Sequence, residues 1–158
     1  MPANVGASLR NYLSLAIFLV VVVGGGLVIG FITLPGEWYA SLAKPPFNPP
    51  NWIFGPTWTV LYVLIAIAGW RIWEHDAHST PMKLWVAQLI LNFAWSPIFF
   101  GAKQPALGLV VIVALLATIV WFIKAARRSD RLAAGLFVPY ALWVAFATLL
   151  NASIVVLN

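Results

Sequence analysis

The chain has 158 residues, of which 63% are hydrophobic and only 8% are charged, with a formal net charge of +5 and no cysteine. A soluble domain carries about 25% charged residues, so the composition argues against a water-soluble protein, and the lack of cysteine excludes disulfides, thiolate nucleophiles and cysteine-ligated metals. The basic residues lie in short segments between apolar runs, which is how membrane topology is encoded, so we expect a protein of the lipid bilayer and no nucleic-acid partner.

Five apolar runs are each long enough to cross a bilayer core of about 30 Å, which takes about 20 helical residues. The first run is too long for the apolar region of a signal peptide, so we expect it to remain as a span. Together the runs predict an all-α membrane protein, a five-transmembrane-helix bundle forming a single integral membrane domain over residues 1–158. The predicted spans cover about residues 12–34, 56–73, 82–101, 105–124 and 133–156.

The first span contains a GxxxG pair, Gly26 and Gly30. Two glycines at this spacing let helix backbones approach closely. The pair could form the face of a homodimer, which we expect for this chain. Tight packing inside one bundle, or room for a ligand beside the helix, is an equally good interpretation.

The connection after the first span, residues 35–55, is rich in both proline and aromatic residues, and we call it the lid. Each proline fixes φ, removes a hydrogen-bond donor and disfavours helix in the residue before it, so the first two-thirds of residues 37–62 cannot be one continuous helix. The chain should become helical near Pro56, since proline is favoured in a first turn. A loop with this many aromatic side chains is unsuited to lying free in water, so we expect it to fold over the mouth of the bundle. The aromatic residues of the stretch 37–62 are Trp38, Tyr39, Phe47, Trp52, Phe54, Trp58 and Tyr62.

Two later spans carry stripes of polar and aromatic residues at helical spacing. Polar groups are costly at bilayer depth unless they are satisfied, so both stripes should face the bundle interior. Hydrogen bonds between helices would explain each residue alone. Two such stripes under an aromatic lid favour a ligand pocket, since ligand sites are mostly apolar with a few placed polar groups. The stripes are Trp85, Gln88, Asn92, Trp95 and Phe99 in the third span, and Tyr140, Trp143, Ala147 and Asn151 in the fifth. The fourth span is nearly featureless and is expected to face lipid or serve as scaffold.

Ionisable residues are missing from the middle of the predicted spans, and His75 and His78 both lie in the connection 74–83. The pattern therefore offers no proton relay or ion path, no metal site and no arrangement typical of a hydrolase or kinase. A flat aromatic ligand suits the remaining residues, because it can stack on Trp and Tyr faces while anionic edges meet Lys44 or Lys103. Without histidine in a span, haem iron would lack its commonest protein ligand, so binding should depend on the ring.

Charge also predicts topology. With five spans, the N-terminus and the second and fourth connections share one side, which we expect to be cytoplasmic by the positive-inside rule. The lid and the C-terminus would face the other side, with only Lys44 and Lys103. The cytoplasmic side would hold Arg10, Arg71, Lys83, Lys124, Arg127, Arg128 and Arg131.

Three motifs, in order along residues 37–151, carry a resemblance to a known family. The first motif includes most of the lid and reads WYxxLxKPxxNPPxWxFxxxWxxLY over residues 38–62. The second runs from Gln88 to Asn92 and on through Trp95-Ser96-Pro97 to Phe99-Phe100. The third runs from Phe137 to Tyr140 and on through Trp143 to Asn151. In these motifs the chain resembles the TspO/MBR family of tryptophan-rich sensory and translocator proteins, the peripheral-type benzodiazepine receptors.

The resemblance implies a receptor or sensor in a bacterial cell membrane that binds porphyrins, such as protoporphyrin IX and haem, and benzodiazepine-type or sterol-like ligands. It implies tetrapyrrole transport or signalling, with no obligatory cofactor. The alternatives are a light-dependent porphyrin-degrading enzyme that uses a pocket tryptophan, and a transporter of lipophilic ligands. Animal members carry a cholesterol motif late in the fifth span, with a basic residue after a tyrosine, whereas nothing basic follows Arg131 here.

The resemblance also assigns residues to the pocket, to which the lid and the first stripe add Tyr39 and Gln88. Neither source assigns a catalytic residue or a metal ligand. The positions carried over from the family motifs are Trp38, Trp52, Tyr62, Asn92, Trp95, Trp143, Ala147 and Asn151.

Overall fold

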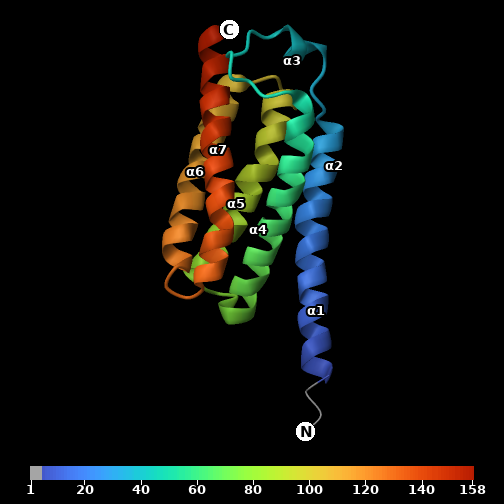
Figure 1. Cartoon of the computed structure of the whole chain (residues 1–158), viewed down its shortest axis with the longest axis vertical. Helices are drawn as coiled ribbons and strands as arrows, with labels where there is room; N and C mark the ends of the chain where they lie inside the picture. Colours follow the sequence, from blue (N-terminus) through green and yellow to red (C-terminus); the bar gives the residue numbers. More distant parts are fainter. Residues whose placement is uncertain (1–4) are drawn as a thin grey trace.

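The structure is a computed structural model that describes residues 5–158 (Figure 1). Every regular element in this range is helical, and five helices are long and apolar enough to cross a membrane. This confirms the predicted fold class, an all-α bundle of five spans. The membrane-length helices are Gly6–Ile32, Asn51–Asp76, Thr80–Gly101, Pro105–Ala126 and Arg131–Leu157.

Two of the five spans contain a turn of π-helix. The first consists of α1 (Val5–Leu19), the π-turn η1 (Val20–Gly24) and α2 (Gly25–Ile32). The third consists of α5 (Thr80–Ser96) and the π-turn η3 (Pro97–Gly101). Pro97 has no N–H to continue the α-helical ladder, and the chain closes a wider turn instead, with the Ala102 N–H bonded to the Pro97 carbonyl at 2.8 Å.

The other spans are α4 (Phe54–Asp76), α6 (Pro105–Ala126) and α7 (Arg131–Leu157). Helices α4, α5, α6 and α7 form a closed ring, each packing on the next, and the first span lies along α4 and α5 on the outside (Figure 1). The short turn before α6 contains Lys103 in the left-handed region, at φ 56°. Helix α6 also buries one face in the core, including Ile112, Ile119 and Phe122, so it is a wall of the bundle as well as a lipid-facing helix.

The lid contains two short helices, α3 (Glu37–Ser41) and the 3-10 turn η2 (Asn51–Ile53), so the chain becomes helical slightly before Pro56. The rings of Trp38 and Tyr39 pack on Phe99, with centroids 6.0 and 6.3 Å apart. The side chain of Asn158 holds the lid from the other side: its Oδ1 accepts from the Ala43 N–H at 3.0 Å, and its Nδ2 donates to the Ala43 carbonyl at 2.9 Å. The lid is therefore fixed over one end of the bundle, as predicted.

The two ends of the molecule differ in charge. The lid and the end of α7 lie at one end, and the α4–α5 and α6–α7 connections lie at the other together with the start of α1 (Figure 1). The second end holds the basic cluster Lys124, Arg127, Arg128 and Arg131. This agrees with the predicted grouping of the connections; which end faces the cytoplasm remains a prediction.

The glycine pair of the first span is divided between two environments. Gly26 is buried and Gly30 is exposed. A Cβ on Gly26 would collide with the ring of Tyr62, whereas a Cβ on Gly30 would meet nothing within 4 Å. Gly26 thus serves packing inside the bundle, where small residues let helices approach in the absence of a hydrophobic driving force.

The substitution Gly26→Ala should destabilise the protein by about 1–3 kcal/mol, since overpacking forces neighbours to move. Gly30→Ala is the matched control. It should be neutral or stabilise by up to about 1 kcal/mol, because alanine is the better helix former. Thermal unfolding in detergent, followed by circular dichroism, measures both. Equal destabilisation by the two variants would contradict this assignment of Gly26.

Candidate functional site

A chain of hydrogen bonds crosses the bundle interior between α4, α5 and α7. The Tyr62 hydroxyl donates to Asn92 Oδ1 at 3.4 Å, and Asn92 Nδ2 donates to the Tyr140 hydroxyl at 2.6 Å. Tyr140 in turn donates to Gln88 Oε1 at 2.8 Å. Gln88 and Tyr140 are fully buried and Asn92 is 6% exposed. Three helices are therefore registered against one another by four polar side chains.

A second polar contact lies closer to the lid. Trp95 Nε1 donates to Asn151 Oδ1 at 3.1 Å, and Asn151 Nδ2 donates to the Pro105 carbonyl at 2.9 Å. This joins α5, α7 and the start of α6. Gly108 makes room for the contact, since a Cβ there would lie 3.3 Å from Asn151 Oδ1.

Aromatic rings surround these hydrogen bonds. Trp58 packs against Tyr62 and Tyr140, with centroid distances of 5.5 and 6.4 Å. Trp143 packs against Phe54 at 5.8 Å and Phe146 at 5.7 Å. Aromatic pairs contribute about 0.5–1.5 kcal/mol each beyond their buried area. We call this region between α4, α5 and α7, made of the hydrogen-bonded side chains and the aromatic rings around them, the seam.

Two buried donors in this seam have no acceptor. They are Gln88 Nε2 and Trp143 Nε1. An unpaired buried donor costs about 1–3 kcal/mol, and buried polar groups are almost always paired. These two N–H groups are therefore available to a ligand acceptor.

The lid covers one end of the seam and contributes a charged side chain, Lys44. Lys44 Nζ lies 4.5 Å from the centre of the Tyr39 ring and donates to the Leu42 carbonyl at 3.1 Å. Burial raises the pKa of the Tyr39 hydroxyl, and a hydrogen bond from Asn48 offsets this in part. Tyr39 is therefore neutral at physiological pH, and Lys44 supplies the positive charge next to the seam.

The structure brings most of the predicted pocket residues together. Tyr62, Gln88 and Asn92 share one hydrogen-bond chain, Trp95 meets Asn151, Trp38 and Tyr39 cover Phe99, and Ala147 lies in the core beside Trp143. Trp52 does not join them, because its side chain is 74% exposed.

Tyr140 was placed on the inward stripe that favours a pocket, but neither it nor Trp58 was among the pocket residues named from the sequence. Tyr140 is central because its single hydroxyl both accepts from Asn92 and donates to Gln88. A tyrosine on a stripe of otherwise apolar and amide side chains was the available signal for it. Trp58 was noted among the aromatic residues of 37–62 and lies within the predicted second span. In the structure it belongs to α4 and packs against Tyr62 and Tyr140.

Comparison with known proteins identifies the family of this chain. The model of the TspO/MBR family matches residues 16–157. The chain belongs to the TspO/MBR family. It is similar to the tryptophan-rich protein TspO of Archaeoglobus fulgidus, with 40% identity over 94% of this chain and 99% of the relative. It is also similar to the tryptophan-rich sensory protein of Cereibacter sphaeroides (36% identity, 85% of each chain) and to the human translocator protein (37% identity, 80% of this chain and 79% of the relative).

Membership of the TspO/MBR family and the five apolar helices together establish a multi-pass membrane protein. The family match spans both stripes and the lid, so the seam described above lies wholly within the family region. The relatives' names describe sensory and translocator proteins.

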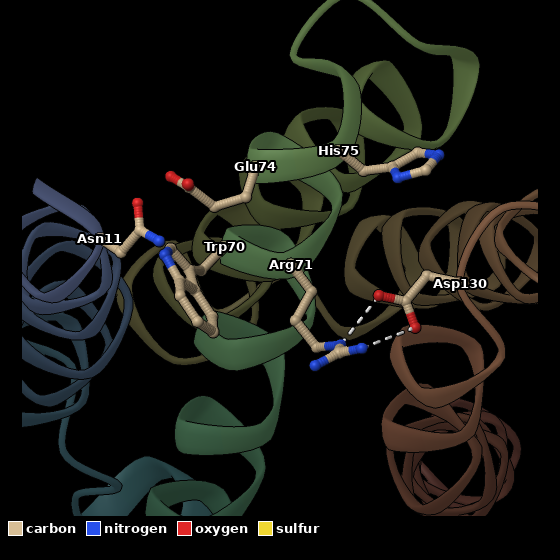
Figure 2. Close-up of a pocket in the computed structure, with 6 residues that line it drawn as sticks. All are labelled: Asn11, Trp70, Arg71, Glu74, His75 and Asp130. Atoms are coloured by element: carbon tan, nitrogen blue, oxygen red, sulfur yellow. Dashed lines mark hydrogen bonds and ion pairs between the residues drawn. The ribbon is translucent and has the colours of Figure 1, made fainter. Parts of the chain in front are cut away.

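A second polar cluster in this TspO/MBR protein lies at the basic end of the bundle, around a hollow of about 310 Å³ (Figure 2). Trp70 Nε1 donates to Ser14 Oγ at 3.0 Å, and Ser14 donates to Glu74 at 2.9 Å, which ties α4 to α1. On the other side of α4, Arg71 pairs with Asp130 at 2.8 Å and ties α4 to α7 (Figure 2). This ion pair was not predicted from the sequence.

Asp130 has two structural functions. It caps α7, accepting from the N–H groups of Leu132 and Ala133 at 3.0 Å each, and it binds Arg71. Burial alone would raise the pKa of the Asp130 carboxyl, but the Ala133 N–H and the Arg71 guanidinium together outweigh it and lower the pKa below 3.8. The carboxylate form is therefore favoured by folding.

The substitution Asp130→Ala should destabilise the protein more than Asp130→Asn, by about 1 kcal/mol, because asparagine still caps a helix and alanine does not. The pH dependence isolates the stability that depends on the charge of Asp130, through both the Ala133 N–H and Arg71. A depressed carboxyl pKa contributes stability that is complete above the unfolded value of 3.8 and is lost as the pH falls through the lower folded value. The difference in Tm between the wild type and Asp130→Asn should therefore be present at pH 7 and shrink below pH 3.8. A difference that stays constant with pH would show that the charge of Asp130 contributes nothing to stability, either through Arg71 or through the N–H groups of α7.

Proposed function

We propose that the chain is a membrane receptor or sensor that binds porphyrins, and other flat lipophilic ligands, in the seam under the lid. The observation that supports this most strongly is the pair of buried donors without acceptors, Gln88 Nε2 and Trp143 Nε1, in a seam otherwise formed by aromatic rings. A flat ring stacks on such faces, and its polar atoms accept from the two free N–H groups. The TspO/MBR membership supports the same class of protein.

The charges near the seam suit an anionic amphipathic ligand. Lys44 lies in the lid, and Lys103 follows η3 at the same end of the bundle. A tetrapyrrole with its ring between the helices and its carboxylates toward the lid would place those carboxylates near these two lysines. Coulomb attraction of this kind is strengthened where water is excluded.

Binding must involve movement of the lid. The lid contacts Phe99 through α3 and is tied to Asn158 by two hydrogen bonds. A ligand that displaces or recloses the lid therefore changes the surface of the protein at that end, which is the property a sensor needs.

The seam also contains no histidine, the commonest protein ligand of haem iron. Both histidines, His75 and His78, lie at the basic end of α4 or just beyond it. Binding should therefore depend on the ring, and haem would be bound as an amphipathic macrocycle.

Trp143→Phe should weaken binding of protoporphyrin IX roughly three- to tenfold, because the smaller ring loses part of the stacking surface, worth about 0.5–1.5 kcal/mol, together with the free N–H. Phenylalanine still fills the space against Phe54 and Phe146, so the bundle should remain folded. Quenching of tryptophan fluorescence in the purified full chain measures the affinity.

Trp121→Phe is the matched control for Trp143→Phe. Trp121 lies on α6 with 61% of its side chain exposed, so its replacement should leave the affinity unchanged. If Trp121→Phe weakens binding and Trp143→Phe does not, the ligand binds on the outer face of α6 and the proposed site is wrong.

Iron-free and iron-loaded porphyrin should bind within about tenfold of each other, or roughly 1.4 kcal/mol. The same titration measures both affinities. A strict requirement for iron would contradict binding that depends on the ring. Illumination of the same samples tests the alternative, a porphyrin-degrading enzyme: loss of the porphyrin absorbance only with folded protein would favour that activity over sensing.

A further inference from the structure

The basic end of the bundle contains a groove that is separate from the proposed porphyrin site in the seam. It lies between the end of α6 and the start of α7 and has a volume of about 890 Å³. This is near the upper end of the 300–1,000 Å³ typical of small-molecule sites, and far more than an inorganic anion needs. The lining residues are Ile123, Lys124, Arg127, Arg128, Arg131, Ala134, Gly135 and Val138.

The lining is divided into a charged part and an apolar part. Four of the eight residues are basic and none is acidic. Asp130 lies next to them in the chain, but its carboxylate is held by Arg71 at 2.8 Å and by the first N–H groups of α7. The positive charge of the groove is therefore not neutralised by its nearest acid.

The apolar part extends from the charged part toward the middle of the membrane. Arg131, Gly135 and Val138 lie on one face of α7, at the helical spacings of four and three residues. Val138 lies seven residues beyond Arg131, which is about 10 Å along the helix axis. Since the headgroup region on each side of a bilayer is about 5–8 Å thick, a molecule that follows this face from Arg131 reaches the acyl chains at Val138, whose side chain is 44% exposed.

Gly135 leaves the middle of the groove open. It is exposed, and a Cβ built on it would meet no atom within 4 Å. The space above Gly135 therefore connects the cluster of cations with the apolar wall.

We propose that this groove binds one anionic phospholipid, with its phosphate among Lys124, Arg127 and Arg131 and an acyl chain along Gly135 and Val138. Charge complementarity selects an anion, and basic pockets between membrane helices are suited to anionic headgroups. The apolar wall within the span selects an anion that carries a hydrocarbon chain. The site is independent of the porphyrin seam and at the opposite end of the bundle.

Native mass spectrometry of the full chain in a neutral detergent tests the proposal, with phosphatidylglycerol as the probe. We expect one phosphatidylglycerol to remain bound at concentrations where phosphatidylcholine with the same acyl chains does not bind. Glycerol 3-phosphate, which has the charge without the chains, should not compete. Equal retention of the two lipids, or full competition by glycerol 3-phosphate, would overturn the proposal.

A double variant tests whether the basic side chains of the groove bind the lipid. Each basic side chain near an anionic lipid contributes about fivefold to the affinity, so Arg127→Gln with Arg131→Gln should weaken phosphatidylglycerol binding about 25-fold. The matched control is Arg10→Gln with Lys83→Gln, which removes the same charge from exposed positions at the same end of the bundle, outside the groove. An equal loss in both double variants would mean diffuse attraction rather than a site.

Gly135→Leu tests the shape of the groove with all four cations kept. Leucine should fill the open space, favour the helix, and abolish the bound phosphatidylglycerol while the Tm is maintained. Gly30→Leu is the control, because Gly30 is also an exposed helical glycine with no atom within 4 Å of its Cβ position. If Gly135→Leu folds and still binds the lipid as the wild type does, the proposed site is wrong.

Discussion

The structure depends on pairing polar groups where there is no water to pair them. Gln88, Asn92 and Tyr140 are buried in a bundle whose outer surface is expected to face lipid. Hydrogen bonds between membrane helices average well under 1 kcal/mol in measured cases, but a donor or acceptor left alone costs about 1–3 kcal/mol. The chain of bonds therefore determines geometry more than it adds stability: any shift of α4, α5 or α7 along its axis would leave one of these groups unpaired.

This constraint also explains how much of the candidate site the sequence predicts. Gln88, Asn92 and Asn151 were expected inside because a polar side chain in an apolar span has few other places to be, and all three are buried. Trp52 was expected in the pocket, yet it is 74% exposed. Helical periodicity assigns a face to each residue of a span, but a proline-rich loop has no period, so residue types alone do not determine which of its aromatic side chains turn inward.

Contacts between distant segments could not be predicted from the sequence, for a different reason. The Arg71–Asp130 pair joins residues 59 positions apart, and the Asn158–Ala43 contact spans 115 positions. Each needs the helices to be in place first. The five spans and the lid followed from apolar length and proline content, whereas these ties follow from how the ends of the helices meet. The same holds for the groove at Gly135, which is lined by residues of both α6 and α7.

The π-turn Val20–Gly24 determines which side of the first span faces the bundle. Ser14 contacts Trp70 and Glu74 before the turn, and Gly26 packs on Tyr62 after it. These two positions are twelve residues apart, and in an uninterrupted α-helix, at about 100° per residue, they would point about 120° away from each other. One extra residue in a wide turn removes about 100° of that rotation, so both contacts lie on the face toward α4. Deleting a single valine from the run 20–23 would leave the two contacts eleven residues apart, a separation over which a regular α-helix turns through about 20° beyond three full turns. Both contacts would then be kept without the wide turn, so the π-turn lets the span hold one more residue while both of its halves still face α4.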